Sequence, residues 1–482
     1  MRLHCSGEPH EQILSNFAKS LMKQVCIQGL GFVGAAMAVA VASARTSEGK
    51  ARYQVIGVDQ DTAEGRRRIE ALNRGDFPFP TTDDCLEAEL QRAIHQKNLL
   101  ATEEEHVYET ADVVVIDIAQ DIEFDQEQPE FDLTNLEKAF NSVARRVPSG
   151  SLILVETTVP PGTCQRVLTP LLNKELMKRG LMEDAVHLAH SFERVMPGDK
   201  YLNSITNFWR VYAGATEEAA DICEGFLSTF IDVDRFPLTR LGSMTASETT
   251  KVMENTYRAV NIAFIDEWTK YAEAIGVDLY EVLDAIRVRP THSNIRFPGI
   301  GVGGYCLTKD PAFAPASVRQ FFNDPSLKFP FSDLARKINN EMPSHSAERV
   351  VDLLGGSVTN KRILVLGVSY RPNVGDTRYS PIAALVDSLE KKNARVTVYD
   401  PLVEYWQERQ MPVHQSLPSA DLFDAVIFAV PHEEILKLDL HAWLAGAKPA
   451  ILDAANCLSR AKRQKCRRAG VRVESVGRGE GL

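Results

Sequence analysis

The sequence has 482 residues, of which 44% are hydrophobic and 25% are charged. This length predicts two or three domains, and this composition is ordinary for a soluble globular protein rather than a disordered one. The formal net charge is −11 and no long basic run is present, which argues against a nucleic-acid partner because phosphates require a basic surface.

The first residues, Met1–Ser20, are mixed polar and lack the apolar stretch of a signal peptide. No run of about 18 apolar residues follows, so the sequence predicts no membrane segment and a cytoplasmic location. The eight cysteines are scattered and form no C-x-x-C pair. The sequence therefore indicates neither a metal site nor a disulfide framework.

The first part of the chain predicts a βαβ unit. Apolar residues at 23–28 predict a strand, the segment 32–42 predicts a buried helix, and residues 53–59 predict a second strand. Strand, helix and strand of these lengths are typical of a parallel sheet. Further strands are predicted at 111–117 and 151–156 with a helix around 133–147, and a strand near 209–213 would complete the first domain.

A glycine turn joins the first strand to the first helix. Its sequence, Gly29-Leu30-Gly31-Phe32-Val33-Gly34, is a G-x-G-x-x-G motif. In such motifs the glycines permit a tight turn, a close approach of the backbone to a pyrophosphate, and close packing of helix on strand. The helix N-terminus adds N–H groups and partial positive charge for the phosphates. We therefore predict a dinucleotide site formed by Gly29, Gly31, Phe32, Val33 and Gly34.

The second strand ends on Asp59. A carboxylate at this place would accept hydrogen bonds from the adenosine ribose hydroxyls, and its charge would repel a 2′-phosphate. This pattern favours NAD over NADP. Arg66, Arg67 and Arg68 follow and could hold a 2′-phosphate, although a solvated helix face is the simpler interpretation.

The pattern changes after Gly242. One long helix without Gly or Pro is predicted up to Ile275, and residues 287–304, with two prolines and four glycines, are predicted to form an ordered loop. A second α/β pattern follows, with strands at 362–367, 395–400, 425–430 and 449–453 and a helix at 380–390. In this part Gly367 is followed by Val368-Ser369-Tyr370, so no glycine cradle for a pyrophosphate is predicted.

The predicted fold class is therefore α/β, with two Rossmann-like doubly wound domains joined by a long central helix and a helical middle domain. The predicted domains are residues 1–235, 236–330 and 331–482.

Two groups of polar residues lie in the middle of the chain. Lys251 and Asn255 are four apart on the long helix and share a face, so they could polarise a hydroxyl or an oxyanion, or form a solvated surface pair. The segment GIGVGGYCLTKD places Cys306 after four glycines and before Lys309 and Asp310. A nearby cation favours the nucleophilic thiolate, and Asp310 could position or deprotonate a water. A buried structural cysteine beside a surface Lys-Asp pair fits the same pattern.

Taken in order, the motifs resemble those of the nucleotide-sugar 6-dehydrogenases, the group that acts on UDP-glucose, GDP-mannose and UDP-N-acetylhexosamines. The resemblance extends from about Lys23 to about Val473. It rests on GLGFVG at 29–34, ETTVPPGT at 156–163, FERVMPG at 192–198, KVMENTY at 251–257, PGIGVGGYCLTKD at 298–310 and LGVSYRPNVGDTRYSP at 366–381.

The resemblance implies an NAD-dependent enzyme that oxidises a primary alcohol to a carboxylate in two hydride transfers. Cys306 would attack the intermediate aldehyde to form a thiohemiacetal, whose oxidation gives a thioester that water hydrolyses. Lys251 and Asn255 would stabilise negative charge on oxygen. Asp310 and Thr158 would hold the water or the alcohol, and Glu193 would assist proton transfer or hydrolysis. Thr158 and Lys309 are also expected at the cofactor.

The resemblance implies further that the second α/β domain binds the nucleotide, that the glycine loop before Cys306 wraps the sugar, and that the long helix forms the core of a homodimer. Arg289 resembles an arginine that is given to the partner's site. The expected substrate-binding residues are Phe192, Arg194, Val195, Lys251, Asn255, Arg289, Gly303, Tyr305, Tyr370, Arg371 and Arg378.

Three positions depart from the family pattern. Ala119-Gln120 stands where Thr-Pro is usual, Phe192 stands where Pro is usual, and CLTKD stands where glucose and mannose enzymes have CLPKD. FERVMPG is closer to the acetamido-sugar enzymes, so glucose and N-acetylhexosamines both stay open. A two-electron β-hydroxyacid dehydrogenase and a catalytically impaired nucleotide-binding relative stay open as alternative functions.

Overall fold

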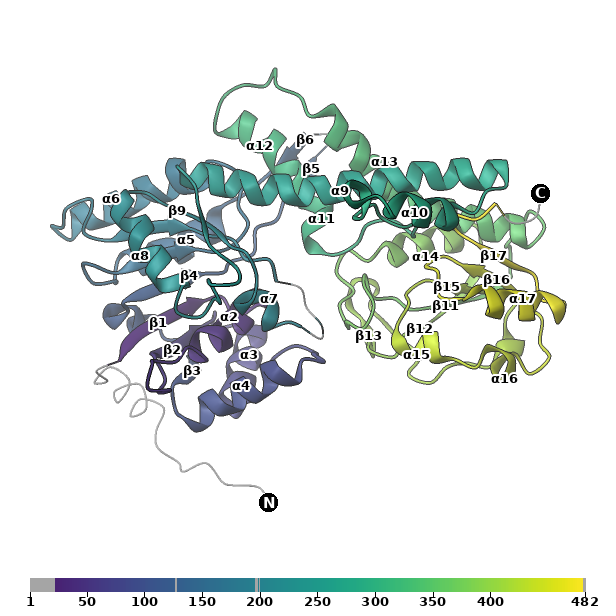
Figure 1. Ribbon diagram of the computed structural model, residues 1–482, viewed down its shortest axis with the longest axis horizontal. Coiled ribbons are helices and arrows are strands. Elements are labelled where there is room, and N and C mark those ends of the chain that lie inside the picture. Colours follow the sequence, from purple (N-terminus) through teal and green to yellow (C-terminus); the bar gives the residue numbers. More distant parts are fainter. Residues whose placement is uncertain (1–21, 126–127, 196–197, 199, 480–482) are drawn as a thin grey trace. The chain divides into compact units, whose positions relative to one another are not determined.

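The computed structural model describes residues 22–125, 128–195, 198 and 200–479. Met1–Ser20, and with it the expectation about a signal peptide, lies outside these residues, as does the Met196-Pro197 part of the FERVMPG motif. The chain forms two compact units (Figure 1), one of residues up to 252 with 313–327 and one of residues 253–312 with 328–482. The division falls inside the long helix α9 (Met244–Ile275), which confirms the helix predicted there. The domain boundaries at 235 and 330 stay predictions.

The first unit is built on an eight-stranded sheet of described residues. In spatial order its strands are β10 (Thr239–Arg240), β9 (Val211–Gly214), β8 (His187–His190), β7 (Leu152–Val155), β4 (Val113–Ile116), β1 (Lys23–Gln28), β2 (Tyr53–Val58) and β3 (Leu99–Thr102). Neighbouring strands are parallel except for β8 and β9, which are antiparallel. The strand order reverses between β1 and β4, and in doubly wound sheets ligands bind outside the carboxyl ends of the strands at this reversal.

Helices cover both faces of this sheet. Along β1, Val25 and Ile27 belong to one apolar cluster and Cys26 to another, because side chains alternate between the two faces of a strand. The helices of this unit are α2 (Phe32–Ala42), α3 (Ala63–Arg74), α4 (Asp84–His95), α5 (Thr134–Ala144), α6 (Thr169–Lys178), α7 (Asn203–Thr206), α8 (Glu217–Leu227) and α12 (Phe313–Gln320).

The second unit contains a five-stranded parallel sheet. Its order is β12 (Arg395–Tyr399), β11 (Arg362–Leu366), β15 (Ala425–Phe428), β16 (Ala450–Asp453) and β17 (Val473–Ser475). Its helices, besides most of α9, are α10 (Leu279–Arg287), α11 (Tyr305–Lys309), α13 (Pro330–Leu353), α14 (Pro381–Lys391), α15 (Glu433–Lys437), α16 (Leu440–Leu444) and α17 (Arg460–Arg468). Two small antiparallel strand pairs complete the described strands. The first unit contains β5 (Glu123–Asp125) with β6 (Gln128–Glu130), and the second contains β13 (Tyr405–Trp406) with β14 (Met411–Pro412).

The strand predicted near 209–213 is present as β9. A further strand that the sequence did not indicate, β10, pairs with its outer edge. The two-residue β10 is too short to show an apolar alternation. The other strands predicted in the two α/β segments are confirmed to within a few residues.

Helix α13 contains a proline in its interior, Pro343. A proline has no N–H for the carbonyl of residue i−4, here Asn339. The glycine loop packs at this point, since a Cβ placed on Gly301, whose φ is +110°, would lie 2.7 Å from the Asn339 oxygen. The close approach of the loop to α13 therefore depends on glycine.

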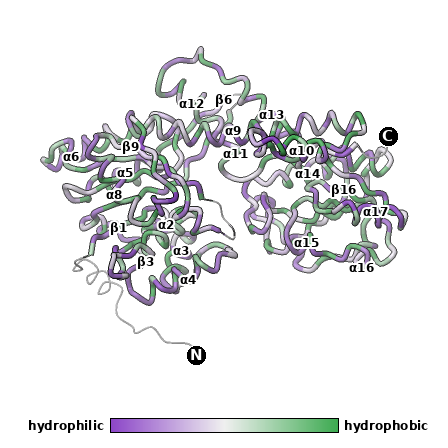
Figure 2. The backbone as a smooth tube through the Cα atoms, viewed as in Figure 1, coloured by the Kyte–Doolittle hydropathy of each residue, from purple (hydrophilic) through white to green (hydrophobic). Residues whose placement is uncertain are grey.

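Hydrophobic and hydrophilic segments are interleaved throughout both units (Figure 2). None of the described helices combines the length and the apolar composition that crossing a bilayer would require.

Glu248 on α9 holds the segment that follows β7. Its buried carboxyl group accepts hydrogen bonds from the backbone N–H of Gly162 at 2.6 Å and of Cys164 at 2.7 Å. Burial raises the pKa of Glu248 from its ordinary value of 4.5 to about 7, although the two amide hydrogen bonds oppose this. A carboxyl whose pKa is higher in the folded than in the unfolded chain stabilises the fold at low pH, and that contribution is lost as pH rises through the folded value.

Replacing Glu248 with glutamine should remove this pH dependence. The free energy of unfolding of the wild type, relative to the glutamine variant, is expected to fall by up to about 3 kcal/mol between pH 4.5 and pH 8, because 2.5 pKa units correspond to roughly that energy. Urea unfolding of both proteins at pH 5, 6, 7 and 8 measures the difference. Parallel curves for the two proteins would contradict the assignment.

Candidate functional site

The glycine turn lies where β1 meets α2, and its three glycines have different surroundings. Gly29 has a φ of +94°, and a Cβ placed on it would lie 2.4 Å from the carbonyl oxygen of Asp117. A Cβ on Gly34 would lie 1.8 Å from the oxygen of Gly29, so α2 packs directly on the turn. A Cβ on Gly31 would meet nothing within 4 Å. These are the tight turn, the close packing and the open approach that a pyrophosphate site requires.

Gly31 is also the N-cap residue of α2 and offers no side chain to the first-turn amides. The first N–H groups of an α-helix have no acceptor within the helix, so they can bind phosphate oxygens. Phe32 and Val33 begin this turn, and Phe32 stacks on Phe79 with ring centroids 4.0 Å apart. The described residues therefore fit the pyrophosphate of NAD.

Asp59 follows β2 and reaches back to the same turn. Its Oδ2 accepts a hydrogen bond from the Leu30 N–H at 3.3 Å and forms an ion pair with Arg68 at 3.2 Å. Arg66 and Arg67 form ion pairs with Asp61 and Glu64 respectively. Each of the three arginines thus has a carboxylate partner, which is consistent with the simpler interpretation of this run.

In the first unit, Lys251 is the cation among the predicted catalytic residues. Its Nζ donates a hydrogen bond to the carbonyl oxygen of Glu193 at 2.8 Å and lies 3.6 Å from the carboxylate of the same residue. The ammonium group also lies 5.3 Å from the ring centroid of the fully buried Phe192. Lys251 is therefore buried, paired and oriented, rather than a solvated surface residue.

The remaining predicted residues of this unit lie around that pair. The guanidinium of Arg194 lies 5.2 Å from the Phe192 ring centroid, and the Val195 N–H donates to the Glu193 carboxylate. Thr158 is half-buried and follows β7 by three residues. Buried His190 binds Ser247 at 2.8 Å, and burial lowers the pKa of His190 to about 3, so its ring is neutral at physiological pH.

In the second unit, Asp310 is the predicted residue that contacts two of the others. Its fully buried carboxylate is within 2.8 Å of the Lys309 Nζ and accepts a hydrogen bond from the Asn255 side-chain amide at 2.6 Å. Lys309 and Asp310 are therefore a buried ion pair and not the surface pair that the pattern also allowed. Asn255 is fixed by this contact with its amide nitrogen towards Asp310.

Cys306 is exposed, in contrast to the buried Asp310 four residues later. Its thiol acts electrostatically on Arg258, Arg378 and Tyr370. Burial, followed by the like charge of Arg296, lowers the pKa of Arg258, and Cys306 is among the groups that oppose this shift. Cations near a thiol favour its nucleophilic form. Arg258 and Arg296 could not be found from the sequence, because their spacing from Cys306 forms no motif.

The loop after β11 carries the residues expected to bind the nucleotide. Arg378 makes a two-pronged ion pair with Asp376, with contacts of 2.7 to 3.2 Å, and this pair raises the pKa of Arg378 although burial opposes it. Tyr305 lies under Lys309, at 4.5 Å, and near Arg378, at 5.6 Å. Arg371 is half-buried and acts electrostatically on Tyr370.

The glycines before Cys306 pack mainly against the protein itself. A Cβ on Gly303 would lie 2.6 Å from Pro381 and 2.8 Å from Tyr370, and a Cβ on Gly304 would lie 2.6 Å from the Tyr370 ring. They let the Cys306 loop approach the loop after β11. Arg289, the residue expected at a partner's site, is exposed at the N-cap of the short turn Pro290–His292.

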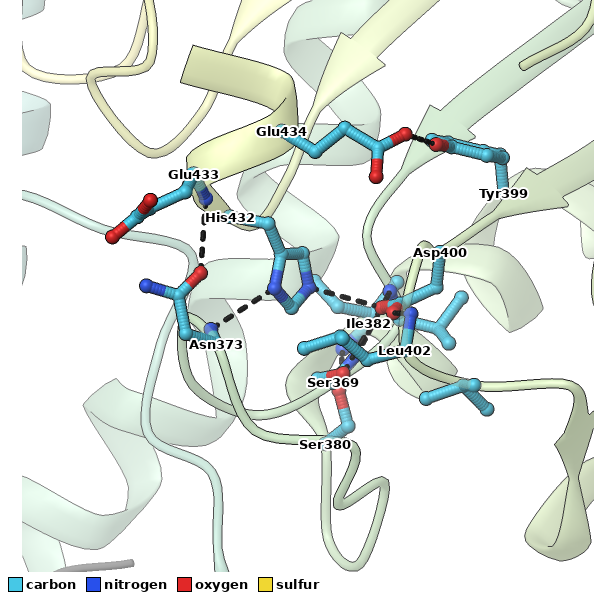
Figure 3. Close-up of polar contacts among 12 residues, drawn as sticks. Ser369, Asn373, Ser380, Ile382, Tyr399, Asp400, Leu402, His432, Glu433 and Glu434 are labelled. Atoms are coloured by element: carbon cyan, nitrogen blue, oxygen red, sulfur yellow. Dashed lines mark hydrogen bonds and ion pairs between the residues drawn. The ribbon is translucent and has the colours of Figure 1, made fainter. Parts of the chain in front are cut away.

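Asp400 follows β12 as Asp59 follows β2, but its carboxylate is occupied by the protein (Figure 3). It accepts hydrogen bonds from the backbone N–H groups of Val368 and Leu402, at 2.8 and 2.9 Å, and from Ser369. His432 accepts a hydrogen bond from the Asn373 N–H on its Nδ1, so its Nε2 carries the proton and donates to Asp400 at 3.1 Å. These bonds hold the pKa of Asp400 below its ordinary value although burial opposes this.

The carboxylate of Asp400 is therefore not available to a ribose, and Gly367 packs on Val430, where a Cβ would lie 2.4 Å from the valine Cβ. The second sheet has the strand order of a nucleotide-binding fold without a second dinucleotide site at this turn. The Asp400–His432 pair instead anchors the loop after β11 at Ser369 and Asn373 (Figure 3). Tyr370 and Arg371 lie between these two residues in the sequence.

Comparison with known proteins gives three matches to one family. The NAD-binding domain of the UDP-glucose/GDP-mannose dehydrogenase family matches residues 23–230, its central domain matches residues 245–341, and its UDP-binding domain matches residues 364–460. Together these matches cover most of the chain.

Individual relatives agree. A UDP-N-acetyl-D-mannosamine dehydrogenase of Methanococcus vannielii is 30% identical over 420 residues, which are 86% of this chain and 88% of the relative. The structure of the UDP-D-ManNAc dehydrogenase of Pyrococcus horikoshii is similar with a TM-score of 0.81 at 27% identity, covering 95% of this chain and 100% of the other. That of an NDP-N-acetyl-D-galactosaminuronic acid dehydrogenase of Methanosarcina mazei has a TM-score of 0.77 at 26% identity, covering 97% and 98%.

The predicted family, the α/β fold class and the NAD cofactor are thereby confirmed. The chain belongs to the UDP-glucose/GDP-mannose dehydrogenase family and is an NAD-dependent nucleotide-sugar dehydrogenase.

Proposed function

We propose that this enzyme oxidises the C6 primary alcohol of a UDP-sugar to the carboxylate in two steps, with Cys306 as the nucleophile. The observation that carries this proposal is that one short segment holds both an exposed cysteine, Cys306, and a buried carboxylate, Asp310, which contacts Asn255 and Lys309. Arg258 and Arg378 act electrostatically with Cys306. A two-electron alcohol dehydrogenase has no use for such a nucleophile. The match of residues 364–460 to a UDP-binding domain supports the nucleotide.

The alcohol loses a hydride from carbon and a proton from oxygen and becomes the aldehyde. The Cys306 sulfur adds to the aldehyde carbon to give a thiohemiacetal, which loses a second hydride and its hydroxyl proton to give a thioester. Water then breaks the carbon–sulfur bond and releases the carboxylate and the thiol. Bound at the Gly29–Gly34 turn, NAD would supply the hydride acceptor for each oxidation, so two NAD molecules would be needed per sugar.

The proposed roles of the other residues follow from their contacts. Lys251 and Asn255 are held by Glu193 and Asp310 and would stabilise negative charge on the reacting oxygen, because preorganised donors act most strongly where water is excluded. Glu193 and Asp310 would move protons or position the attacking water, and Thr158 would hold the alcohol or the water. Arg371 and Arg378 would bind the diphosphate.

For the sugar we propose an N-acetylhexosamine in preference to glucose. Two observations support this choice. The relatives described above act, by their names, on acetamido sugars. The segment from Phe192 to Gly198 also resembles that of the acetamido-sugar enzymes more than that of the glucose and mannose enzymes.

A panel of nucleotide sugars tests the proposal. The purified enzyme with NAD is offered UDP-N-acetylmannosamine, UDP-N-acetylglucosamine, UDP-N-acetylgalactosamine, UDP-glucose and GDP-mannose, and NADH and the uronate are quantified. Two NADH per UDP-N-acetylhexosamine are expected. One NADH with release of an aldehyde would favour the two-electron alternative. Binding of NAD and UDP without NADH formation on any sugar would favour the impaired relative.

We propose further that the protein is a homodimer through α9. A stripe of large apolar side chains on this helix is between 44% and 70% exposed and consists of Met253, Tyr257, Phe264, Trp268, Tyr271 and Ile275. Their spacing of three, four and seven residues places them along one side of a helix, as in helix pairs. An exposed apolar stripe of this kind is typical of an interface.

Replacing Trp268 with glutamate should therefore weaken dimerisation by about 10²–10³-fold, because a two-fold symmetric interface would bury the introduced carboxylate of each subunit. Sedimentation velocity over a range of protein concentrations measures the change. Trp209 provides a matched control, since both indoles are about half exposed and each packs against two aromatic rings. If Trp209→Glu dissociates the protein and Trp268→Glu does not, α9 is not the interface.

A further inference from the structure

Asp117 lies directly beside the cofactor turn. It is the first residue after β4, at the reversal of strand order, and its N–H donates a hydrogen bond to the Gln28 oxygen at 2.8 Å. A Cβ on Gly29 would lie 2.4 Å from the carbonyl oxygen of Asp117, and a Cβ on Gly34 would lie 3.2 Å from the Cβ of Asp117. Asp117 therefore packs against both ends of the turn, at the carboxyl edge where a dinucleotide binds.

The carboxyl group of Asp117 is incompletely satisfied by the protein. Its Oδ2 is buried and makes no hydrogen bond within the described part of the chain. By contrast, both oxygens of Asp59 on the other side of the turn accept backbone hydrogen bonds. An unsatisfied buried polar atom costs about 1–3 kcal/mol, so such an atom beside a ligand site indicates a contact completed by the ligand.

The groups around Asp117 act in opposite directions on its pKa. Burial and the like charge of Glu193 raise the pKa of Asp117 well above its ordinary value, and Arg210 opposes this. Arg210 is itself engaged, since its guanidinium forms a buried ion pair with Glu156. Helix α2 contains no charged residue, and the only charged residue of β1, Lys23, is at the far end of that strand. A carboxyl in these surroundings is easily kept neutral.

We propose that Asp117 contacts NAD as a neutral carboxylic acid, which donates a hydrogen bond to the bound dinucleotide and makes cofactor binding depend on a proton. An ionised Asp117 would repel the pyrophosphate at the N-terminus of α2, whereas the acid form donates to an oxygen acceptor. The complex then holds one proton more than the free enzyme wherever Asp117 is ionised without NAD. Linkage requires that the affinity for NAD(H) falls as pH rises, by at most tenfold per pH unit.

The test is the dissociation constant of NADH, measured by fluorescence titration of the full-length protein from pH 6 to pH 9. In the wild type this constant should rise with pH. In Asp117→Asn, whose carboxamide is neutral and can donate, the constant should stay near the low-pH wild-type value at every pH. In Asp117→Ala it should also be independent of pH but about tenfold weaker, because the donor is lost. Calorimetry in two buffers should show proton uptake on binding in the wild type and none in Asp117→Asn.

Asp112→Asn is the matched control. Asp112 precedes β4 at the opposite end of the strand, where its carboxylate accepts the Gln24 N–H at 2.7 Å, so this variant should keep the wild-type pH dependence. The proposal is overturned if the wild type shows no pH dependence, or if Asp117→Asn keeps the wild-type slope. It is equally overturned if Glu193→Gln abolishes the slope while Asp117→Asn does not.

Discussion

Replacing Cys306 with alanine should stop the oxidation at the aldehyde and lower uronate formation by roughly 10³-fold or more, the scale on which removal of a covalent nucleophile acts. Without the sulfur no thiohemiacetal forms, and the second hydride can leave only from the hydrate of the aldehyde, which the cysteine does not hold in place. The first oxidation needs no thiol, so NADH should still form, but with about one equivalent per sugar in place of two.

Quantifying NADH, uronate and hydroxylamine-trapped aldehyde in a single-turnover experiment measures the effect. Cys85→Ala is a matched control, because Cys85 is also an exposed cysteine but lies on α4 of the first unit. This variant should give two NADH per sugar at the wild-type rate. If Cys306→Ala does so as well, the covalent route is wrong and Cys306 serves only the packing of its loop.

The features that could be predicted from the sequence are those whose cause is local. Strand β1, the glycine turn and α2 were predicted at their observed residues, because an apolar strand, a G-x-G-x-x-G turn and a helix of Ala and Val all indicate the same structure. Helix α13 was missed because a proline such as Pro343 normally ends a helix, whereas here the helix continues to Leu353 and the Gly301 loop packs close to the Asn339 carbonyl.

Long-range charge relations could not be predicted. Asp59 and Asp400 each follow the second strand of a βαβ unit, and the glycine pattern distinguishes the two turns but does not indicate that the Asp400 carboxylate is occupied. The difference between a carboxylate beside an open turn and one filled by its own loop depends on His432, which is 32 residues away. Arg258 and Asp117 were missed for the same reason, because their partners come from other elements and form no motif.

Replacing Asp310 with asparagine should both destabilise the second unit and slow turnover. Its fully buried carboxylate is the partner of Lys309 at 2.8 Å and of Asn255 at 2.6 Å. Loss of its charge leaves a buried ammonium uncompensated, which costs about 3–5 kcal/mol in comparable pairs. If Asp310 also positions or deprotonates the water, turnover should fall by about 10²–10⁴-fold. Urea unfolding and steady-state kinetics measure the two effects separately.

The double variant Lys309→Met/Asp310→Asn distinguishes a structural role of Asp310 from a chemical one. Removing both charges takes away the unpaired ammonium, so most of the lost stability should return, because replacing both partners of a buried ion pair by groups of similar volume is often nearly neutral. Turnover should stay low, because the double variant still lacks the Asp310 carboxylate that would position or deprotonate the water. Recovery of both stability and turnover would show that Asp310 acts only through Lys309. Lys309→Met alone, measured against NAD concentration, reports whether the ammonium also contributes to cofactor binding, as the family resemblance implies.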